Sequence, residues 1–322
     1  MLRVVLCALL SCVLPVCADA GDANAPGSIN LVVLSNGQFE LAVSPATGRI
    51  VRYGRAGGRN LLWENPRAAE AASPFPGWLN WGGDKLWIWP ESDWKLWQDR
   101  EHGSPPGDPP PSAYQVVRAS PCLLRMTSPV IARYGVRIVR DIVLEETGSR
   151  VKMVNTLEKV AEGSLALPVA PWTVTQIPAP TMILARLAPT AAPPGYAAFP
   201  PNPWKDVVVT GNVVVMKRPP APWVKMGLEA DLLAVPVGDL LFTAQVVTPA
   251  YSAETYQPLC RAQVFSAPDS SRFLPPGVGA YVEMEFTAPA RKLAAGESVS
   301  LAIVWELHPV KEDGAAAFLQ RR

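Results

Sequence analysis

Proline recurs through most of this chain and limits the elements that the chain can form. The sequence has 35 prolines and 23 glycines among 322 residues. Proline removes a backbone donor, so it is excluded from helix interiors and central strand positions and divides a chain into short pieces. Short alternating runs lie between these breaks, as in Val136–Leu144 and Tyr281–Phe286. The pattern predicts an all-β protein of short strands joined by loops.

The opening of this β pattern is a predicted meander. Asn36–Gly37 carries the hairpin signal between a strand at Ile29–Leu34 and one at Gln38–Val43. Arg49–Tyr53 and Asn60–Trp63 are the predicted third and fourth strands. The length allows one large all-β domain or two smaller ones.

The first 20 residues have the features of an export signal. Arg3 supplies a positive start, Val4–Val16 is an apolar run, and Ala18-Asp19-Ala20 has the form of a cleavage site. We therefore expect a signal peptide at 1–20 and a single domain at 21–322, placed in the periplasm or secreted. A lipid-modified cysteine at Cys17 is the alternative. The apolar run is short for a membrane span and no later segment is apolar enough, so no span is expected.

Charge and cysteine content exclude several classes of partner. The formal net charge of +1 gives no argument for nucleic acid or for an acidic membrane surface. Beyond the signal only Cys122 and Cys260 remain, and a disulfide or two buried thiols are both open. With His102 and His308 as the only histidines, we expect no zinc site, no other metal and no cofactor.

A tryptophan-rich stretch, Gly77–Asp99, holds six of the eleven tryptophans together with several charged residues. Flat indoles stack on the C–H face of a sugar ring, and charged groups bind its hydroxyls. If Leu86–Trp89 is extended, Trp87 and Trp89 share a strand face with Lys85. The alternative is a buried turn region with solvated charges. The candidate sugar-binding residues in this stretch are Trp81, Asp84, Lys85, Trp87, Trp89 and Glu91.

Several segments together resemble the galactose-mutarotase-like (aldose 1-epimerase-like) superfamily. The stretch ELAVSPATGRIVRYGRAGGRNLLWENP resembles its opening strands, and YVEMEFTAP with the later LAAGES and VWE resembles its closing strands. LNWGGDKLWIWPES and APWTVTQ resemble segments of an uncharacterised bacterial family placed in that superfamily. The resemblance implies a β-supersandwich of antiparallel sheets that binds sugar on a concave sheet face.

The same resemblance implies a departure from mutarotase chemistry. Those enzymes protonate the ring oxygen with a histidine and abstract the anomeric proton with a glutamate. Pro171 and Trp172 stand where the histidine is expected, and tryptophan can do neither. Trp172, Thr175 and Gln176 suit sugar binding instead, with a structural corner as the alternative.

Two carboxylates later in the chain are candidates for chemistry. Glu283 and Glu285 are two residues apart on a predicted strand and share a face, so their pKa values can separate and divide acid and base roles. A solvated strand face is the alternative. Glu254 and Tyr256 in a late loop are weaker candidates.

The sequence thus predicts an exported carbohydrate-binding protein. The alternatives are a carbohydrate-active enzyme (epimerase, hydrolase or lyase) that uses Glu283, Glu285 or Asp84, and a structural or protein-interaction module. If Trp81, Asp84, Lys85 and Trp172 line one cavity with Glu283, a sugar site is favoured. If they lie on separate faces, the site hypothesis fails. The sequence predicts neither the sugar nor the oligomeric state.

Overall fold

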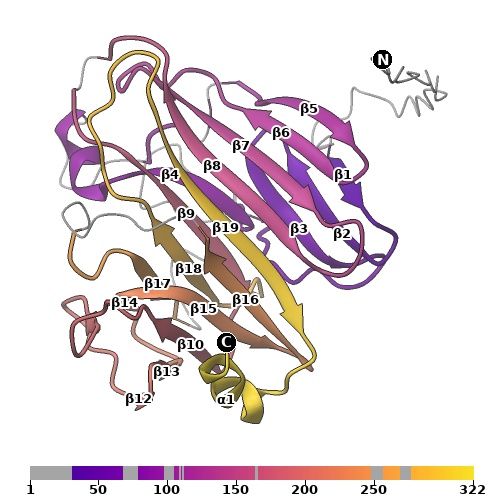
Figure 1. Cartoon of the computed structure of the whole chain (residues 1–322), viewed down its shortest axis with the longest axis vertical. Helices are drawn as coiled ribbons and strands as arrows, with labels where there is room; N and C mark the ends of the chain where they lie inside the picture. Colours follow the sequence, from indigo (N-terminus) through magenta and orange to yellow (C-terminus); the bar gives the residue numbers. More distant parts are fainter. Residues whose placement is uncertain are drawn as a thin grey trace, which may run out of the picture.

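A computed structural model describes residues 31–67, 79–97, 105–108, 110, 112–163, 166–247, 257–268 and 277–322. The predicted signal segment, His102, Glu254 and Tyr256 lie outside these ranges. The described strands form two large antiparallel sheets that pack face to face (Figure 1). The prediction of an all-β fold of antiparallel sheets is confirmed.

The first sheet has nine strands and begins with the N-terminal meander. Its order is β1 (Val32–Ser35), β2 (Phe39–Ser44), β3 (Arg49–Arg55), β4 (Asp84–Trp89), β9 (Ala170–Pro178), β18 (Tyr281–Thr287), β17 (Ala262–Ser266), β14 (Val224–Leu228) and β11 (Tyr196–Ala198). The centre of this sheet therefore joins three distant parts of the chain, at β4, β9 and β18.

The second sheet has ten strands. Its order is β12 (Val207–Thr210), β13 (Val213–Lys217), β10 (Met182–Leu187), β15 (Ala230–Val237), β16 (Leu240–Val246), β19 (Ser298–His308), β8 (Val151–Lys159), β7 (Val136–Leu144), β6 (Leu123–Thr127) and β5 (Gln115–Ser120). The C-terminal helix α1 (Ala315–Gln320) packs against β10 and β13 of this sheet (Figure 1).

The hydrophobic core lies between the two sheets. Leu86, Met284 and Phe286 from the first sheet pack in one cluster with Ile142 and Trp305 from the second. Each of these strands alternates core residues with residues that point the other way, as the period of two requires. The face of the nine-stranded sheet that points away from the ten-stranded sheet is called the outer face below.

The predicted fourth strand at Asn60–Trp63 is wrong. This segment is irregular, and only Glu64 next to it forms an isolated bridge, with Gly82. The Asn60 side-chain oxygen accepts from the backbone N–H groups of Tyr53 and Leu62. Such local bonds compete with strand pairing, and they turn the chain here.

Cys122 and Cys260 do not form a disulfide. Both Cys122 and Cys260 are free thiols. Cys122 lies near β1, where its sulfur is 3.4 Å from the Ser35 carbonyl oxygen, whereas Cys260 is buried beside the start of β17.

No helix among the described residues combines the length and hydrophobicity that a membrane crossing needs.

Candidate functional site

The outer face of the nine-stranded sheet gathers most of the predicted site residues. On β4, alternation turns Lys85, Trp87 and Trp89 outward, while Leu86 and Ile88 enter the core. On the neighbouring strand β9, Trp172 pairs directly with Trp87. On β18, Glu283 and Glu285 pair with Gln176 and Val174 of β9 and share the outer face with them. The expected shared faces are therefore present.

Asp84 lies on the opposite face of β4 from Lys85, so the predicted residues do not all converge with Glu283 on one face. This placement corrects the prediction of Asp84 as a sugar-binding carboxylate. Asp84 is 1 % exposed and lies between the two sheets. Its carboxylate pairs with Arg140 of β7, and it accepts from the Thr175 hydroxyl at 2.8 Å. The physical reason is the strand period, which sends Asp84 and Lys85 in opposite directions.

The first ion pair on the outer face joins Lys85 to Glu283. Lys85 Nζ lies 3.3 Å from Glu283 Oε1, and Gln176 Nε2 donates to the same oxygen at 2.9 Å. Burial lowers the pKa of Lys85, and the opposing charge of Glu283 offsets only part of that effect. Lys85 also lies over the ring of Trp87, 4.5 Å from its centroid.

The second ion pair joins Lys225 of β14 to Glu285. Lys225 Nζ lies 3.1 Å from Glu285 Oε2, and the Trp172 indole N–H donates to that same oxygen at 2.9 Å. Burial raises the pKa of Glu285 from 4.5 to about 7, against the lowering effect of Lys225. For Lys225, burial acts to lower the pKa, but the charges of Glu285, Glu91 and Glu283 and the hydrogen bond to Glu285 together outweigh it, and the pKa rises. Glu285 can therefore gain or lose a proton near neutral pH.

Together these groups form a polar stripe across five strands of the outer face. Its members come from β4, β9, β18, β17 and β14: Lys85, Gln176, Glu283, Glu285, Gln263 and Lys225. Lys225 and Gln263 were not among the predicted residues. Nothing local in the sequence marks them, because only the pairing of β14 and β17 with β18 brings them to the site.

The tryptophans beside the polar stripe form a packed indole cluster of Trp87, Trp89, Trp94 and Trp172. Trp87 meets Trp94 and Trp172 edge to face, with ring centroids 5.4 Å and 5.3 Å apart. Trp94 comes from the 3₁₀ helix η2 (Glu91–Trp97) and packs against both rings.

This packing corrects the expectation that these indoles form an open stacking wall. Trp87, Trp94 and Trp172 are at most 6 % exposed, and Trp89 alone of the four is half-buried. The rings pack against one another, and the Trp87 N–H donates to Asp108 at 2.8 Å. They hold the end of the polar stripe in place and offer little ring surface for stacking.

A second set of aromatic rings, not predicted from the sequence, lies on the other side of the polar stripe. This aromatic row contains Trp63, Tyr281, Phe265 and Trp223, with successive centroids 4.4, 6.2 and 6.1 Å apart. Phe265 and Tyr281 are half-buried, and Trp223 is 39 % exposed. The row therefore presents ring surface at the edge of the charged groups.

Trp81 and Glu91 lie at the margin of this region. Trp81 is half-buried just before β4, where its carbonyl accepts from the Asn65 N–H at 3.1 Å. Glu91 is exposed at the start of η2, and its charge acts on both Lys225 and Glu285. The glycines before β4 lie close to neighbouring backbone. A Cβ at Gly83 would lie 2.2 Å from the Ile50 carbonyl oxygen, so the close approach is to β3.

No histidine in the described ranges reaches the outer face. His308 lies at the end of β19 in the other sheet, where its Nε2 is 3.1 Å from the Thr243 hydroxyl and its ring is 4.9 Å from that of Phe318. Trp172 occupies the position on β9 where the resemblance implied a histidine, and it is bonded to Glu285.

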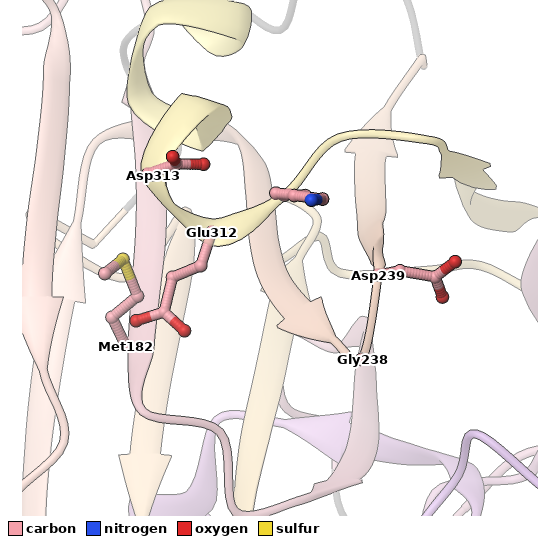
Figure 2. A pocket seen from close by; sticks show the side chains of 6 residues that line it. Met182, Gly238, Asp239, Glu312 and Asp313 are labelled. Carbon is pink, nitrogen blue, oxygen red and sulfur yellow. The ribbon is translucent and has the colours of Figure 1, made fainter.

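A pocket of about 670 Å³ lies elsewhere, beside the C-terminal helix. It is lined by Met182, Gly238, Asp239, Lys311, Glu312 and Asp313. Figure 2 shows that the carboxylates of Asp239, Glu312 and Asp313 point in different directions and do not converge on one point. The described part of the chain contains no cluster of three or more histidine, cysteine, aspartate or glutamate side chains able to hold a metal ion.

Comparisons with known proteins identify the fold. No model of a protein family matches the chain, and no curated protein matches it. Among solved structures, the fold is similar to a galactose mutarotase-like protein from Lactobacillus casei. The TM-score is 0.55 at 12 % identity, over 86 % of this chain and 100 % of that one.

A protein from Escherichia coli K12 with a provisional assignment as an aldose 1-epimerase is similar with a TM-score of 0.52 at 17 % identity. The match covers 86 % of this chain and 98 % of that one. The Slr1438 protein from Synechocystis is similar with a TM-score of 0.55 at 9 % identity, over 87 % and 96 % of the two chains. The fold is therefore the galactose-mutarotase-like β-sandwich.

Proposed function

We propose that this protein binds a carbohydrate on the outer face of its nine-stranded sheet and acts outside the cytoplasm. The observation that carries the proposal is the polar stripe itself. Two ion pairs, Lys85–Glu283 and Lys225–Glu285, lie largely buried on a sheet face that points away from the hydrophobic core. Unlike the Asp84–Arg140 pair, these pairs lie outside the contact between the two sheets, and they place two carboxylates and two ammonium groups together where a ligand can bind.

The chemistry of the outer face suits a sugar ring. Carboxylates accept from sugar hydroxyls, while ammonium and amide groups donate to sugar oxygens. The aromatic row beside the polar stripe supplies flat apolar surface at Phe265, Tyr281 and Trp223, on which the C–H face of a ring can pack. A fold shared with mutarotase-like proteins supports this ligand class by analogy.

The test is a panel of mono- and oligosaccharides, read by thermal shift and by intrinsic tryptophan fluorescence. At least one sugar should raise the melting temperature of the mature chain and change the emission. For that sugar, Phe265→Ala should weaken binding about tenfold, a difference of roughly 1.4 kcal/mol. Phe318→Ala is the matched control, because Phe318 is also half-buried but lies on α1 against the other sheet. A panel without any response would remove the binding proposal.

An enzyme acting on sugars is the second candidate, and one observation favours it. Glu285, with its pKa raised to about 7 by burial, lies two residues from Glu283 on one strand face. If this pair acts as acid and base, Glu283→Gln and Glu285→Gln should each abolish turnover while binding persists. Unchanged turnover in both variants would exclude these glutamates from the reaction.

A further inference from the structure

Two buried polar atoms on the outer face have complementary chemistry but no hydrogen-bond partner among the described residues. Gln263 of β17 and Glu285 of β18 are directly opposite each other in the strand register. Gln263 is 2 % exposed and Glu285 is fully buried. Gln263 Nε2, a donor, and Glu285 Oε1, an acceptor, form no hydrogen bond with any described residue. Buried polar atoms are nearly always bonded, so this pair requires an explanation.

The surroundings explain why these two side chains do not satisfy each other. The other carboxylate oxygen of Glu285, Oε2, binds both the Trp172 N–H at 2.9 Å and Lys225 Nζ at 3.1 Å. These two bonds fix the orientation of the carboxylate, and Oε1 is left without a hydrogen bond to any described residue.

On its other side, Gln263 faces Gly227 of β14, which has no side chain. A Cβ at Gly227 would lie 2.3 Å from the Leu259 carbonyl oxygen and 2.9 Å from the Phe199 ring. This space therefore holds the Leu259 backbone and an apolar ring, and β14 supplies no side-chain partner for the amide.

We propose that Gln263 and Glu285 form a subsite for one hydroxyl group of the ligand. The hydroxyl donates to Glu285 Oε1 and accepts from Gln263 Nε2, so a single O–H group satisfies both atoms. The subsite deepens the proposed function and rests on it for the identity of the ligand as a carbohydrate.

The neighbouring charges restrict what this subsite accepts. The Glu285 carboxylate would repel a ligand carboxylate or phosphate. Lys225, which is bound to the other oxygen of that carboxylate, would repel a ligand ammonium group. A hydroxyl carries no charge and can act as donor and acceptor at once. The subsite therefore selects an uncharged hydroxyl at this position of the sugar ring, and a sugar that lacks it leaves two buried atoms unpaired.

The first experiment uses the sugar that gives the largest thermal shift in the panel, together with its series of deoxy derivatives. Gln263→Leu should weaken binding of the parent sugar on the order of tenfold, and it should not change the affinity for the one deoxy derivative that lacks the bound hydroxyl. Gln245→Leu, a half-buried glutamine on β16 of the other sheet, is the matched control and should bind like the unaltered protein. Unchanged affinity in Gln263→Leu, or an equal loss for every derivative, would overturn the subsite.

The second experiment uses the unaltered protein and glycerol as the probe, so it depends on no sugar and on no variant that must fold. A crystal structure grown with glycerol should place a hydroxyl oxygen within hydrogen-bond distance of both Gln263 Nε2 and Glu285 Oε1. A Gln263 side chain turned to bond Glu285 directly, or a water that glycerol does not displace, would overturn the subsite.

These two outcomes separate the subsite from the function. A bound glycerol hydroxyl with a negative sugar panel supports the subsite and removes the carbohydrate proposal. A positive panel in which Gln263→Leu binds normally and glycerol leaves the position unfilled removes the subsite and keeps the carbohydrate proposal.

Discussion

Adjacent residues on β4 send their charges to opposite faces of one sheet. Asp84 pairs with Arg140 between the sheets, and Lys85 pairs with Glu283 on the outer face. Arg140 also donates to the Asn155 side chain at 2.8 Å, so a buried polar network links β4 to β7 and β8 of the other sheet. Asp84 therefore contributes to sheet packing, while Lys85 belongs to the candidate site.

Loss of the Asp84 carboxylate should destabilise the fold strongly. Asp84→Ala leaves Arg140 buried without its counter-charge, so we expect the free energy of unfolding to fall by roughly 3–5 kcal/mol. The control is Asp141→Ala, which breaks an exposed pair with Arg125 and should cost at most about 1 kcal/mol. Urea unfolding monitored by tryptophan fluorescence measures both changes. Equal losses in the two variants would contradict the structural role of the buried pair.

Glu285 should make stability depend on pH. Burial raises its pKa from 4.5 to about 7, so the folded chain holds this proton more tightly than the unfolded chain. The resulting stability is fully present below pH 4.5 and is lost as the pH rises through about 7, by up to roughly 3 kcal/mol. The groups that face Glu285 are Lys225, Glu283 and Glu91, and their charges set the size of the effect.

The measurement for this prediction is urea unfolding at several pH values from 4 to about 8. Glu285→Gln should flatten the fall in stability, because the amide does not titrate. Glu158→Gln, which alters a part-exposed pair with Arg137 on the other sheet, should keep the slope of the unaltered protein. An identical slope in Glu285→Gln would show that another group titrates in this range.

At the level of elements, two glycines determine how β4 enters the sheet. Gly82 and Gly83 have φ values of 86° and 73°, a region that other residues rarely adopt. A Cβ on either one would lie 2.2 Å from a carbonyl oxygen, that of Trp63 or that of Ile50. These contacts bring β4 beside β3 and position Lys85 and the indole cluster that follow it.

Gly83→Ala should therefore be much more damaging than an alanine at an ordinary turn glycine. It combines an unfavourable φ with a clash against backbone that cannot move freely, so we expect a loss of roughly 2–5 kcal/mol. Gly148→Ala is the control, because Gly148 has a similar φ of 75° but open space around its Cβ position. It should cost only about 1–2 kcal/mol. Thermal unfolding of the two variants measures the difference, and equal losses would argue against the backbone clash.

For the whole molecule, the candidate site depends on strand order. Lys225, Gln263 and Phe265 reach the outer face because β14 and β17 pair beyond β18. Trp63 joins Tyr281 from a loop more than two hundred residues earlier in the chain. The site is therefore a property of the assembled sheet and of no single segment.

Export remains a prediction about the whole chain. Expression of the full sequence in a bacterial host should yield a protein in the periplasm or medium that begins at Gly21, which intact-mass measurement and N-terminal sequencing would detect. Cys17→Ser should leave this processing unchanged. A lipid on Cys17, or retention of residues 1–20, would contradict the predicted cleavage.

Local sequence determined much of the fold. Alternating side chains marked β7 with its observed ends, Val136–Leu144, and Asn36–Gly37 marked the first hairpin, where the Asn36 side-chain oxygen accepts from the Phe39 N–H at 2.8 Å. Alternation also placed Lys85 with Trp87, and Glu283 with Glu285, on shared faces. These features depend on the period of two and on turn chemistry, which residues close in sequence decide.

The tertiary structure decided which of these residues make the site. The strand order of the first sheet buried most of the indole cluster and turned Asp84 toward Arg140. It also brought together the aromatic row of Trp63, Tyr281, Phe265 and Trp223. Sequence spacing says which residues share a face, but not whether that face packs against the other sheet or becomes the outer face. That choice comes from burying the apolar face of each strand, a property of both sheets together.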